Sequence, residues 1–466
     1  MKIKNIPAML IVLLLFACDG FLDIEPKQSI DSETALSSSE NLRLALNQAY
    51  VNIRNGYGQQ LLHAGALLPD DGEIFFQGTY LEPREYLNKE LVASSLWPRE
   101  AWQDLYKGIY ICNQVLGHIE VAEPDAKNQL MGEALFLRGL CYFDLTRYFA
   151  PAYEPGGANE ADAVPLLLEN DTTMYPPRAS VEAVINQAQA DLEQAASLLA
   201  PDEHFFAGSY AAKAILSRLY LMKEEWEKAA TAASEVIESG QFSLMETPLA
   251  AFNHPSNLQE DVFAFQQNND DNLGSEQGTG NEGMSTFYAS TNVTGRSDFA
   301  MNDKVFDLYE EGDLRAAIQT DLGEDSDESD IESMYYRGFG SNSNDGIFCA
   351  KWLNFENNVT FIRLAEMYLT RAEANLENGS ETGDLPVNDI ARIRSRAGLS
   401  TPETIDLELV RTERIRELIF EGWRLHHYRR WKWSVGELPY NAPRLVLPIP
   451  QRERDVNNKL SQNNGY

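Results

Sequence analysis

Apolar residues recur three or four positions apart along most of the chain, as they do on one face of an α-helix. The clearest example is the stretch 132–149, which predicts an amphipathic helix packed against a neighbour. Its apolar stripe consists of Ala134, Leu137, Cys141, Leu145 and Tyr148. The same spacing predicts further helices at residues 102–113, 180–199, 361–376, 387–396 and 407–431. We therefore predict a mostly α-helical fold.

Residues 209–240 predict two helices separated by a break at residues 223–225. Small side chains in this stretch, such as Ala211 and Ala230, allow the two helices to approach closely. A hairpin of this kind is typical of tetratricopeptide repeats, which must stack to bury their apolar faces. We predict a right-handed, tetratricopeptide-like helical repeat core built from segments far apart in the sequence.

Two stretches, around residues 51–100 and 241–355, break the helical pattern because they are rich in Gly, Asn, Asp and aromatic residues. Only short runs such as residues 261–267 resemble strands. Long irregular connections often carry function. We predict a loop-rich portion with short strands that binds the ligand. No Pro/Ser-rich linker divides the 466 residues, so residues 31–466 are predicted to form one domain.

The first 18 residues predict a lipoprotein signal. Two lysines precede an apolar run at residues 8–17, which is too short to cross a bilayer and suits a signal peptide. The run ends in Leu-Phe-Ala-Cys at residues 15–18, so we expect cleavage after residue 17 and a lipid on Cys18. Residues 18–30 would form a polar tether. A transmembrane helix is the alternative interpretation, and the shortness of the run disfavours it.

Charge and cysteine content narrow the class of protein further. Residues 1–17 contain two lysines and no acid, so their removal changes the formal charge from −33 to −35. Such acidity excludes nucleic-acid binding that depends on neutralising phosphates. Beyond Cys18 the chain has Cys112, Cys141 and Cys349, an odd number without a CxxC pair. We predict buried free thiols. A Cys112–Cys141 disulfide stays open as the alternative.

Motifs of catalysis, cofactor binding and metal binding are weak or absent. The chain has no HExxH, Walker lysine loop or GxSxG elbow. Residues 278–283 match GxGxxG without the flanking strand and helix that would hold a pyrophosphate. The acidic run 321–330 offers Asp325, Asp327 and Asp330 to calcium but lacks the glycine of an EF-hand, which favours a solvated loop. We predict no enzyme, cofactor or metal site.

Five segments in order along the chain resemble the RagB/SusD family of nutrient-uptake outer-membrane lipoproteins. The first is the lipobox at Cys18. The others are residues 132–155, which include Arg138, Tyr142, Phe143, Asp144 and Arg147, then 361–379, 390–399, and the C-terminal stretch 407–431 with 447–466. One departure is the run 424–431, where the family more often has an acidic residue at the position of His426 or His427. These adjacent histidines point to different helix faces, which argues against a shared metal.

The resemblance implies a SusD-like fold and a lipid-anchored protein on the exterior of the outer membrane. It implies capture of oligosaccharides and their delivery to a SusC-like TonB-dependent transporter. Peptide capture, as in RagB-like members, remains an alternative, and a surface enzyme is a third. The charged residues of the motifs are predicted to tie helices together by ion pairs rather than to catalyse. They are Glu366, Arg371, Glu373, Glu413, Arg416 and Glu417.

Ligand binding is expected to use flat aromatic rings, because sugar C–H faces pack on them while polar side chains bond the hydroxyls. The candidates in the first irregular stretch are Phe76, Tyr80, Tyr86 and Trp97, with Arg84 and Asn88 beside them. Those in the second are Phe287, Tyr288, Tyr335 and Tyr336. Trp97 is the first choice, since it precedes Pro98 and is predicted to lie extended just before a helix. Trp102, Tyr106 and Tyr110, at helical spacing, are predicted to pack in the core.

Overall fold

The computed structural model describes residues 36–466 except 170, 172, 202–204, 274–282, 292, 294, 324–325 and 340–344. The predicted signal peptide 1–17, Cys18 and the tether 18–30 lie outside the described residues. So do Asp325 of the acidic run and most of the glycine motif at 278–283. Asp327, by contrast, is described, and it caps a short helix by accepting a hydrogen bond from the Ser329 N–H.

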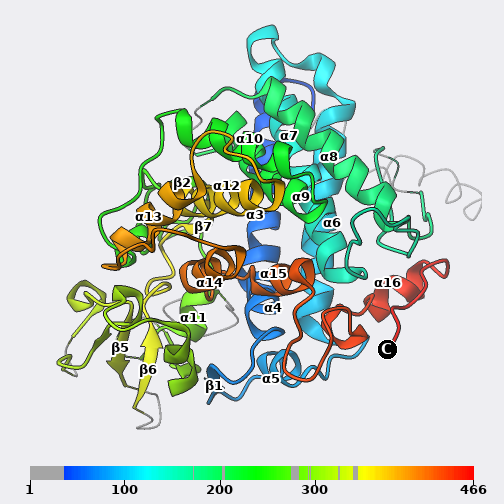
Figure 1. The fold of residues 1–466 in the computed structure, drawn as a ribbon. Coiled ribbons are helices and arrows are strands. Elements are labelled where there is room, and N and C mark those ends of the chain that lie inside the picture. The colour runs from blue at the N-terminus through cyan, green and yellow to red at the C-terminus, as the bar shows by residue number, and fades with distance from the viewer. Residues whose placement is uncertain are drawn as a thin grey trace, which may run out of the picture.

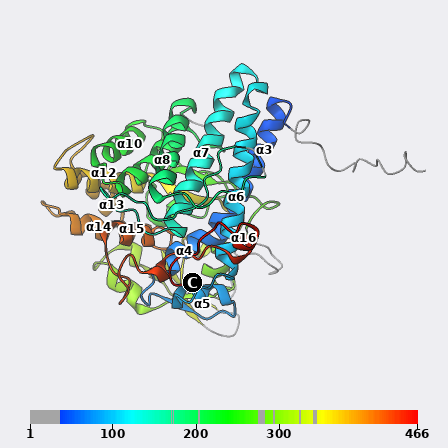
Figure 2. The same ribbon diagram turned by 90° about the vertical axis from the view of Figure 1, so that its right-hand side faces the viewer.

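A stack of helices forms the larger part of the molecule. Each helix packs against the next in the order α7 (Pro124–Phe149), α8 (Val181–Leu198), α9 (Ser209–Met222), α10 (Trp226–Glu238) and α12 (Leu364–Asn378). Helices α13 (Pro386–Arg396) and α14 (Leu407–Leu418) continue the stack from α12, and Figure 1 shows the whole row. On the other side of α7 lie α3 (Ser39–Asn55) and α6 (Leu96–Gly117), as Figure 2 shows. The predicted helical repeat core is confirmed.

Local signals place the ends of these helices. The Ser180 hydroxyl accepts a hydrogen bond from the Ala183 N–H and starts α8. Gly379 ends α12 in the left-handed conformation, at φ +62°. The predicted break at residues 223–225 is confirmed, because α9 ends at Met222 and α10 begins at Trp226. The alanines of α10 let it pack closely on its neighbours, since Ala229, Ala230 and Ala233 have no exposed surface.

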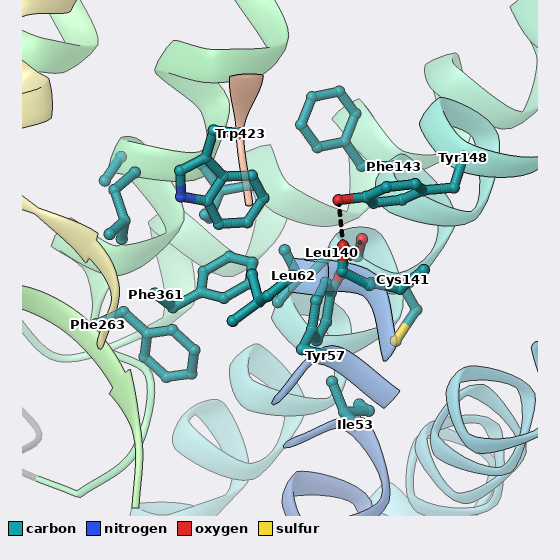
Figure 3. Packing of buried hydrophobic residues seen from close by; sticks show 14 of the residues in the cluster. Ile53, Tyr57, Leu62, Leu140, Cys141, Phe143, Tyr148, Phe263, Phe361 and Trp423 are labelled. Atoms are coloured by element: carbon teal, nitrogen blue, oxygen red, sulfur yellow. Dashed lines mark hydrogen bonds between the residues drawn. The ribbon is translucent and has the colours of Figure 1, made fainter. Parts of the chain in front are cut away.

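An aromatic core joins the helices to a two-stranded sheet. Strand β2 (Asp261–Phe265) pairs antiparallel with β7 (Val359–Arg363). From these strands Phe263 and Phe361 point toward Tyr57 and Trp423, as Figure 3 shows. The Phe361 ring meets Tyr57 and Trp423 edge-on, at centroid distances of 4.8 and 4.9 Å.

Short elements make up the second irregular stretch, as predicted. Strand β1 (Ile74–Phe76) pairs antiparallel with β3 (Phe299–Met301), while β5 (Tyr335–Gly338) lies between β4 (Ile318–Gln319) and β6 (Gly346–Cys349). Helix α11 (Met284–Tyr288) precedes β3.

The remaining elements are spread along the described chain. The short 3-10 helices are η2 (Ile119–Val121), η3 (Leu249–Ala251), η4 (Asp303–Leu308), η5 (Leu314–Ala316), η6 (Glu328–Asp330) and η7 (Pro443–Leu445). Helices α5 (Leu81–Asn88), α15 (Arg424–Trp431) and α16 (Gln451–Val456) complete the fold.

The first irregular stretch is more helical than predicted. Helix α3 runs into a π-helical turn, η1 (Gly56–Leu61), and then into α4 (Leu62–Leu67). The glycines here serve close packing rather than turns. A Cβ on Gly65 would lie 1.7 Å from the Gly422 carbonyl oxygen. The prediction of an irregular chain is therefore wrong for residues 51–67, because sequence composition does not distinguish a packing glycine from a turn glycine.

The predicted helix at 407–431 is also wrong as a single element. It is interrupted between α14 and α15, where Phe420 and Gly422 have φ values of +61° and +85°. A Cβ on Gly422 would lie 2.7 Å from the Leu62 Cα, so this turn packs directly on α4. The predicted helix at 361–376 likewise begins later, because residues 359–363 form β7.

The buried polar residues follow the predictions more closely. Cys112, Cys141 and Cys349 are free and buried, so the predicted free thiols are confirmed and the alternative disulfide is not formed. Burial raises the pKa of the Cys112 thiol to about 12. The predicted ion pairs between helices are confirmed, for example between Arg218 and Glu366 at 2.6 Å. No helix in the described part of the chain is both long and apolar enough to span a bilayer.

Candidate functional site

An open groove lies between the loop that precedes β1 and helix α5, at the lower end of the molecule in Figure 1. The centre of a water molecule can occupy about 510 Å³ of it. Three of the predicted ligand-binding residues line this groove, namely Phe76, Arg84 and Asn88. The other lining residues are Asp70, Asp71, Gly72, Ile74, Leu87 and Lys89. We name this feature the β1–α5 groove.

Strand pairing and one arginine hold Phe76 at the groove. Phe76 pairs with Phe299 across the two strands, and their rings are 5.7 Å apart. The Arg84 guanidinium lies 5.5 Å from the centre of the Phe76 ring and donates a hydrogen bond of 2.7 Å to the Gly78 carbonyl. Arg84 is exposed and Phe76 half-buried. A flat ring and a charged donor therefore face solvent together.

Tyr80 extends the aromatic surface next to the groove. Its half-buried ring is 4.2 Å from the Arg296 guanidinium, which also pairs with Asp298 at 2.7 Å. Phe75 and Leu81 are more exposed, at 55% and 62%. Our sequence reasoning missed Phe75 and Arg296. Adjacent residues of a strand face opposite sides, so the Phe-Phe pair in β1 could have indicated an outward ring next to Phe76.

Trp97 and Tyr86 are buried, so the prediction that they are exposed is wrong. Neither side chain has exposed surface. Trp97 lies in the first turn of α6 rather than before it, since Pro98 is tolerated where the backbone N–H has no helical partner. Its ring stacks on His63 at 5.0 Å and lies 5.6 Å from Tyr86. The groove in this conformation thus offers neither ring to a ligand.

Phe287 and Tyr288 are buried as well, against the prediction. Both lie on α11, and their rings pack against Phe299 at 5.2 and 5.0 Å. Phe287 also meets Trp97 edge-on at 5.5 Å. The structure therefore brings the two irregular stretches together in one buried layer beneath Phe76 and Tyr80. We name it the aromatic layer, and its members are Tyr86, Trp97, Phe287, Tyr288 and Phe299.

Tyr335 and Tyr336 lie apart from the groove and are buried, so their predicted exposure is also wrong. They belong to β5, the central strand of its sheet, which other residues cover. The Tyr336 hydroxyl accepts a hydrogen bond of 2.9 Å from the Ser290 N–H. The Tyr335 hydroxyl lies 3.2 Å from that of Tyr309. Both rings stabilise the sheet of β4, β5 and β6.

A buried carboxyl pair fixes the loop at one wall of the groove. The Asp70 carboxylate accepts hydrogen bonds from the N–H groups of Gly72 and Ile74, at 2.9 and 3.1 Å. Burial, and then the neighbouring Glu73, raise the pKa of Asp70 to about 7. Burial alone would also raise the pKa of Glu73, but its ion pair with Arg424 at 2.8 Å outweighs this and lowers it. One proton of the pair is thus retained near neutral pH.

The groove presents groups that can bind a sugar. An aromatic face, an amide and a guanidinium can pack on a sugar ring and bond its hydroxyls. The carboxylates of Asp70 and Glu73 already bond backbone N–H groups and Arg424. Within the described ranges, no three His, Cys, Asp or Glu side chains are grouped as a metal ion would require.

Two family models match the chain. One, described as "Starch-binding associating with outer membrane", matches residues 20–221, and another, described as "SusD family", matches residues 324–444. SusD-like protein P25 of Formosa agariphila is 24% identical over the full length of both chains. A SusD-like protein of Bacteroides ovatus is 26% identical, covering 96% of this chain and 84% of its own.

A solved structure has a similar fold. The crystal structure of a putative sugar binding protein from Bacteroides vulgatus is 25% identical and superposes with a TM-score of 0.78. The match covers 93% of this chain and all of that one. The mostly helical architecture with small sheets is therefore shared with that protein.

Proposed function

The chain belongs to the SusD/RagB family, and on that premise we propose that it is a carbohydrate-binding protein of the outer membrane. It captures oligosaccharides in the β1–α5 groove without cleaving them. Support for a carbohydrate ligand comes from the description of the family model that matches residues 20–221. Support for the location of the site comes from the groove itself.

One observation carries the choice of site. Phe76, Arg84 and Asn88 lie on one open groove, and Tyr80 lies beside it with its ring half-exposed. Rings that are rigidly backed bind with a small loss of conformational entropy. The aromatic layer supplies such backing, since Phe299 contacts Phe76 and Phe287 contacts Tyr80. We expect these two half-exposed rings to stack on successive sugar units.

The walls of the groove favour sugars over peptides. Capture of an extended peptide uses backbone donors and acceptors along a cleft. The β1–α5 groove is open, and the residues that line it supply a ring, a guanidinium and an amide. The groove therefore supports the oligosaccharide proposal, and a peptide panel serves as the competing arm of the test.

The test is calorimetry with a panel of oligosaccharides and peptides. Oligosaccharides should bind better than monosaccharides, since one sugar reaches only one or two rings. Phe76→Ala should weaken binding about fivefold, because one stacked ring contributes on the order of 1 kcal/mol. Tyr110→Ala is the matched control, since this ring on α6 is 44% exposed away from the groove. Unchanged affinity in Phe76→Ala would remove the groove from the proposal, and release of reducing ends would show an enzyme.

The protein is proposed to act at the outer surface with two partners. A lipid on Cys18 would hold it in the outer membrane, and a SusC-like TonB-dependent transporter would accept the ligand. Cys18→Ala should release a folded protein into the soluble fraction, and co-purification with the transporter should survive mild detergent. Retention of a cleaved Cys18→Ala product in cells that lack the transporter would contradict the lipid anchor. Recovery of the protein alone after cross-linking in native membranes would contradict the partnership.

A further inference from the structure

A second cavity lies among helices α7, α9, α12, α14 and α15, lined by residues other than those of the β1–α5 groove. The centre of a water molecule can occupy about 50 Å³ of it, which is room for a few waters or one small ion. Its walls are unusually basic. The arginines that line it are Arg147, Arg218, Arg414, Arg429 and Arg430, and two histidines, His426 and His427, lie between them.

Three carboxylates of the described chain lie within ion-pair distance of these five arginines, and each is already engaged. Glu366 accepts two hydrogen bonds from Arg218, at 2.7 and 2.6 Å. Glu373 accepts two from Arg430, at 2.7 and 2.8 Å. Asp144 pairs with Arg147. Five arginines against three carboxylates therefore leave the lining with an excess of two positive charges.

Arg429 and Arg414 carry this excess. Arg429 donates only to carbonyl oxygens in the described structure, those of Arg147 and Leu445. Arg414 donates a hydrogen bond of 2.9 Å to the Thr370 hydroxyl, and its Nε lies 3.2 Å from Glu373 without hydrogen-bond geometry. Burial lowers the pKa of Arg414, and it lowers that of Arg429 to about 10. Both guanidinium groups thus stay charged at neutral pH. Arg429 has no carboxylate within ion-pair distance among the described residues, and Arg414 shares Glu366, at 3.7 Å, and Glu373 with Arg218 and Arg430.

Six buried nitrogens of the residues that line this cavity have no hydrogen-bond partner among the described residues. They are Arg218 Nη1, Arg414 Nε, Arg414 Nη1, Arg429 Nε, His426 Nε2 and His427 Nε2. The Arg414 side chain is 1% exposed and that of Arg218 5%. Leaving a buried charged donor unpaired is costly. A single small acceptor in the cavity would satisfy several of these donors at once.

The two histidines add donors rather than charge. Burial, and then the positive charge of Arg147, lower the pKa of His426 far below its ordinary value, and burial followed by Arg414 does the same for His427. A neutral imidazole still carries one N–H. The histidines are held by ring contacts, since His426 meets Tyr148 edge-on at 4.5 Å and His427 stacks on Trp431 at 5.4 Å.

We propose that this cavity binds a small oxyanion of the sulfate or phosphate class, held by Arg414, Arg429 and His427. The oxygens of such an ion only accept hydrogen bonds, and the arginines and histidines of the cavity can donate them. Arginine is the side chain that proteins favour for binding such oxygens. The room of about 50 Å³ for the centre of a water molecule accommodates a tetrahedral oxyanion. The proposed ligand is the free ion, and the acidic group of a glycan is the competing outcome of the test. The site is independent of the proposed carbohydrate groove, since the two share no lining residue.

The test compares melting temperatures in sulfate and in chloride at equal ionic strength. Sulfate stabilises most proteins without saturation by exclusion from the surface, so a specific site must show a saturable rise above that background. His427→Asp places a carboxylate where the ion would bind. It should abolish the saturable rise and raise the melting temperature in chloride. His118→Asp, at the end of α6, introduces the same charge elsewhere and should keep the saturable rise.

A direct measurement covers the case in which a variant does not fold. Crystals of the unmodified protein soaked in selenate should give an anomalous peak about 4 Å from Arg414 and His427 nitrogens, because each nitrogen would donate to a selenate oxygen at about 2.9 Å and selenium lies one bond beyond that oxygen. Water alone in the cavity, together with an unsaturated sulfate response equal in the unmodified protein and His427→Asp, would overturn the proposal. Electron density for an acidic oligosaccharide in the cavity, without an anomalous peak in the selenate soak, would overturn the choice of the free ion.

Discussion

Two buried clusters of the molecule differ in chemistry and in how far the sequence indicates them. In the first, between β7, α13 and α14, Glu417 accepts hydrogen bonds from Arg363 and Arg396 at 3.1 and 2.6 Å. We call it the charged core. The second is the aromatic layer under the β1–α5 groove, where uncharged rings meet edge to face or stacked.

The difference shows for which residue types the local sequence predicts burial and contacts. A buried charge requires a partner, so a motif with both signs at helical spacing implies ion pairs between helices. An aromatic ring requires no partner and is found both inside and on the surface. Whether Trp97 is buried depends on Phe287, which lies 190 positions along the chain. Local sequence therefore indicates the charged core and leaves the aromatic layer undetermined.

The largest expected effect comes from the charged core. Glu417→Gln should lower the free energy of unfolding by about 5 kcal/mol, because Arg315, Arg363 and Arg396 would lose a buried carboxylate. Urea denaturation followed by circular dichroism measures this. Glu377→Gln removes a carboxylate from a partly exposed pair with Arg411 and should cost at most about 1 kcal/mol. Equal effects of the two changes would contradict the distinction.

The aromatic layer should be the next most sensitive region. Trp97→Ala should lower the free energy of unfolding by about 4 kcal/mol, since it opens a cavity against His63, Tyr86 and Phe287. Tyr110→Ala, which removes a partly exposed ring from the same helix, should change it by about 0.5 kcal/mol or less. Both values come from chemical denaturation. A stable Trp97→Ala protein that binds glycan weakly would instead restore Trp97 as a surface residue.

The carboxyl pair beside the groove predicts a dependence on pH. The folded pKa of Asp70 lies at about 7, above the ordinary value of 3.8, so its stabilising contribution is complete below about pH 4 and is lost as the pH rises toward 7. Between pH 5.5 and 7 the loss should reach about 2 kcal/mol, at about 1.4 kcal/mol per pH unit. Glu73 titrates at lower pH because Arg424 pairs with it.

Asp70→Asn isolates this contribution. The variant should lack the part of the pH dependence that lies between pH 5.5 and 7, while other groups titrate in both proteins. Unfolding free energies measured at several pH values give the two slopes. Parallel slopes would show that Asp70 is already ionised below pH 5.5 in the folded protein.

The smallest effect on stability is expected at the groove surface. Arg84→Ala removes one hydrogen bond to the Gly78 carbonyl and one contact with the Phe76 ring, from an exposed side chain. It should change the free energy of unfolding by less than about 0.5 kcal/mol and weaken glycan binding severalfold. Arg99→Ala changes a partly exposed arginine at the start of α6 and should leave affinity unchanged. A loss of stability without a loss of affinity would assign Arg84 to the fold.

The helical core could be predicted because its signal is local. Apolar periodicity gave α7, α8, α9, α10 and α13, and the break between α9 and α10. The interruption of residues 407–431 could not be read locally, because Gly422 is placed by contact with Leu62 of a distant helix. The same holds for Gly65, whose role depends on Gly422.

The sequence predicted the region of the candidate site but not which of its aromatic residues are exposed. Phe76, Arg84 and Asn88 line the groove, and Tyr80 lies beside it. The six other predicted rings are buried, because pairing of β1 with β3 and packing of α11 cover four of them and the sheet of β5 covers two. Phe75 was missed because a three-residue strand gives only a short alternation, although its place next to Phe76 could have indicated a ring on the opposite face.

The π-helical turn η1 makes the groove depend on the number of residues in the chain. Within it the Leu62 N–H bonds the Tyr57 carbonyl, five residues earlier instead of four. Deleting one residue there would let residues 39–67 wind as one regular α-helix and would rotate everything beyond by about 100°. Leu62 and Gly65 would then turn away from Gly422, and the loop at Asp70 would leave the groove. Insertions and deletions in this turn should therefore be tolerated far less than substitutions, which marks it as a point where the length of the chain is itself constrained.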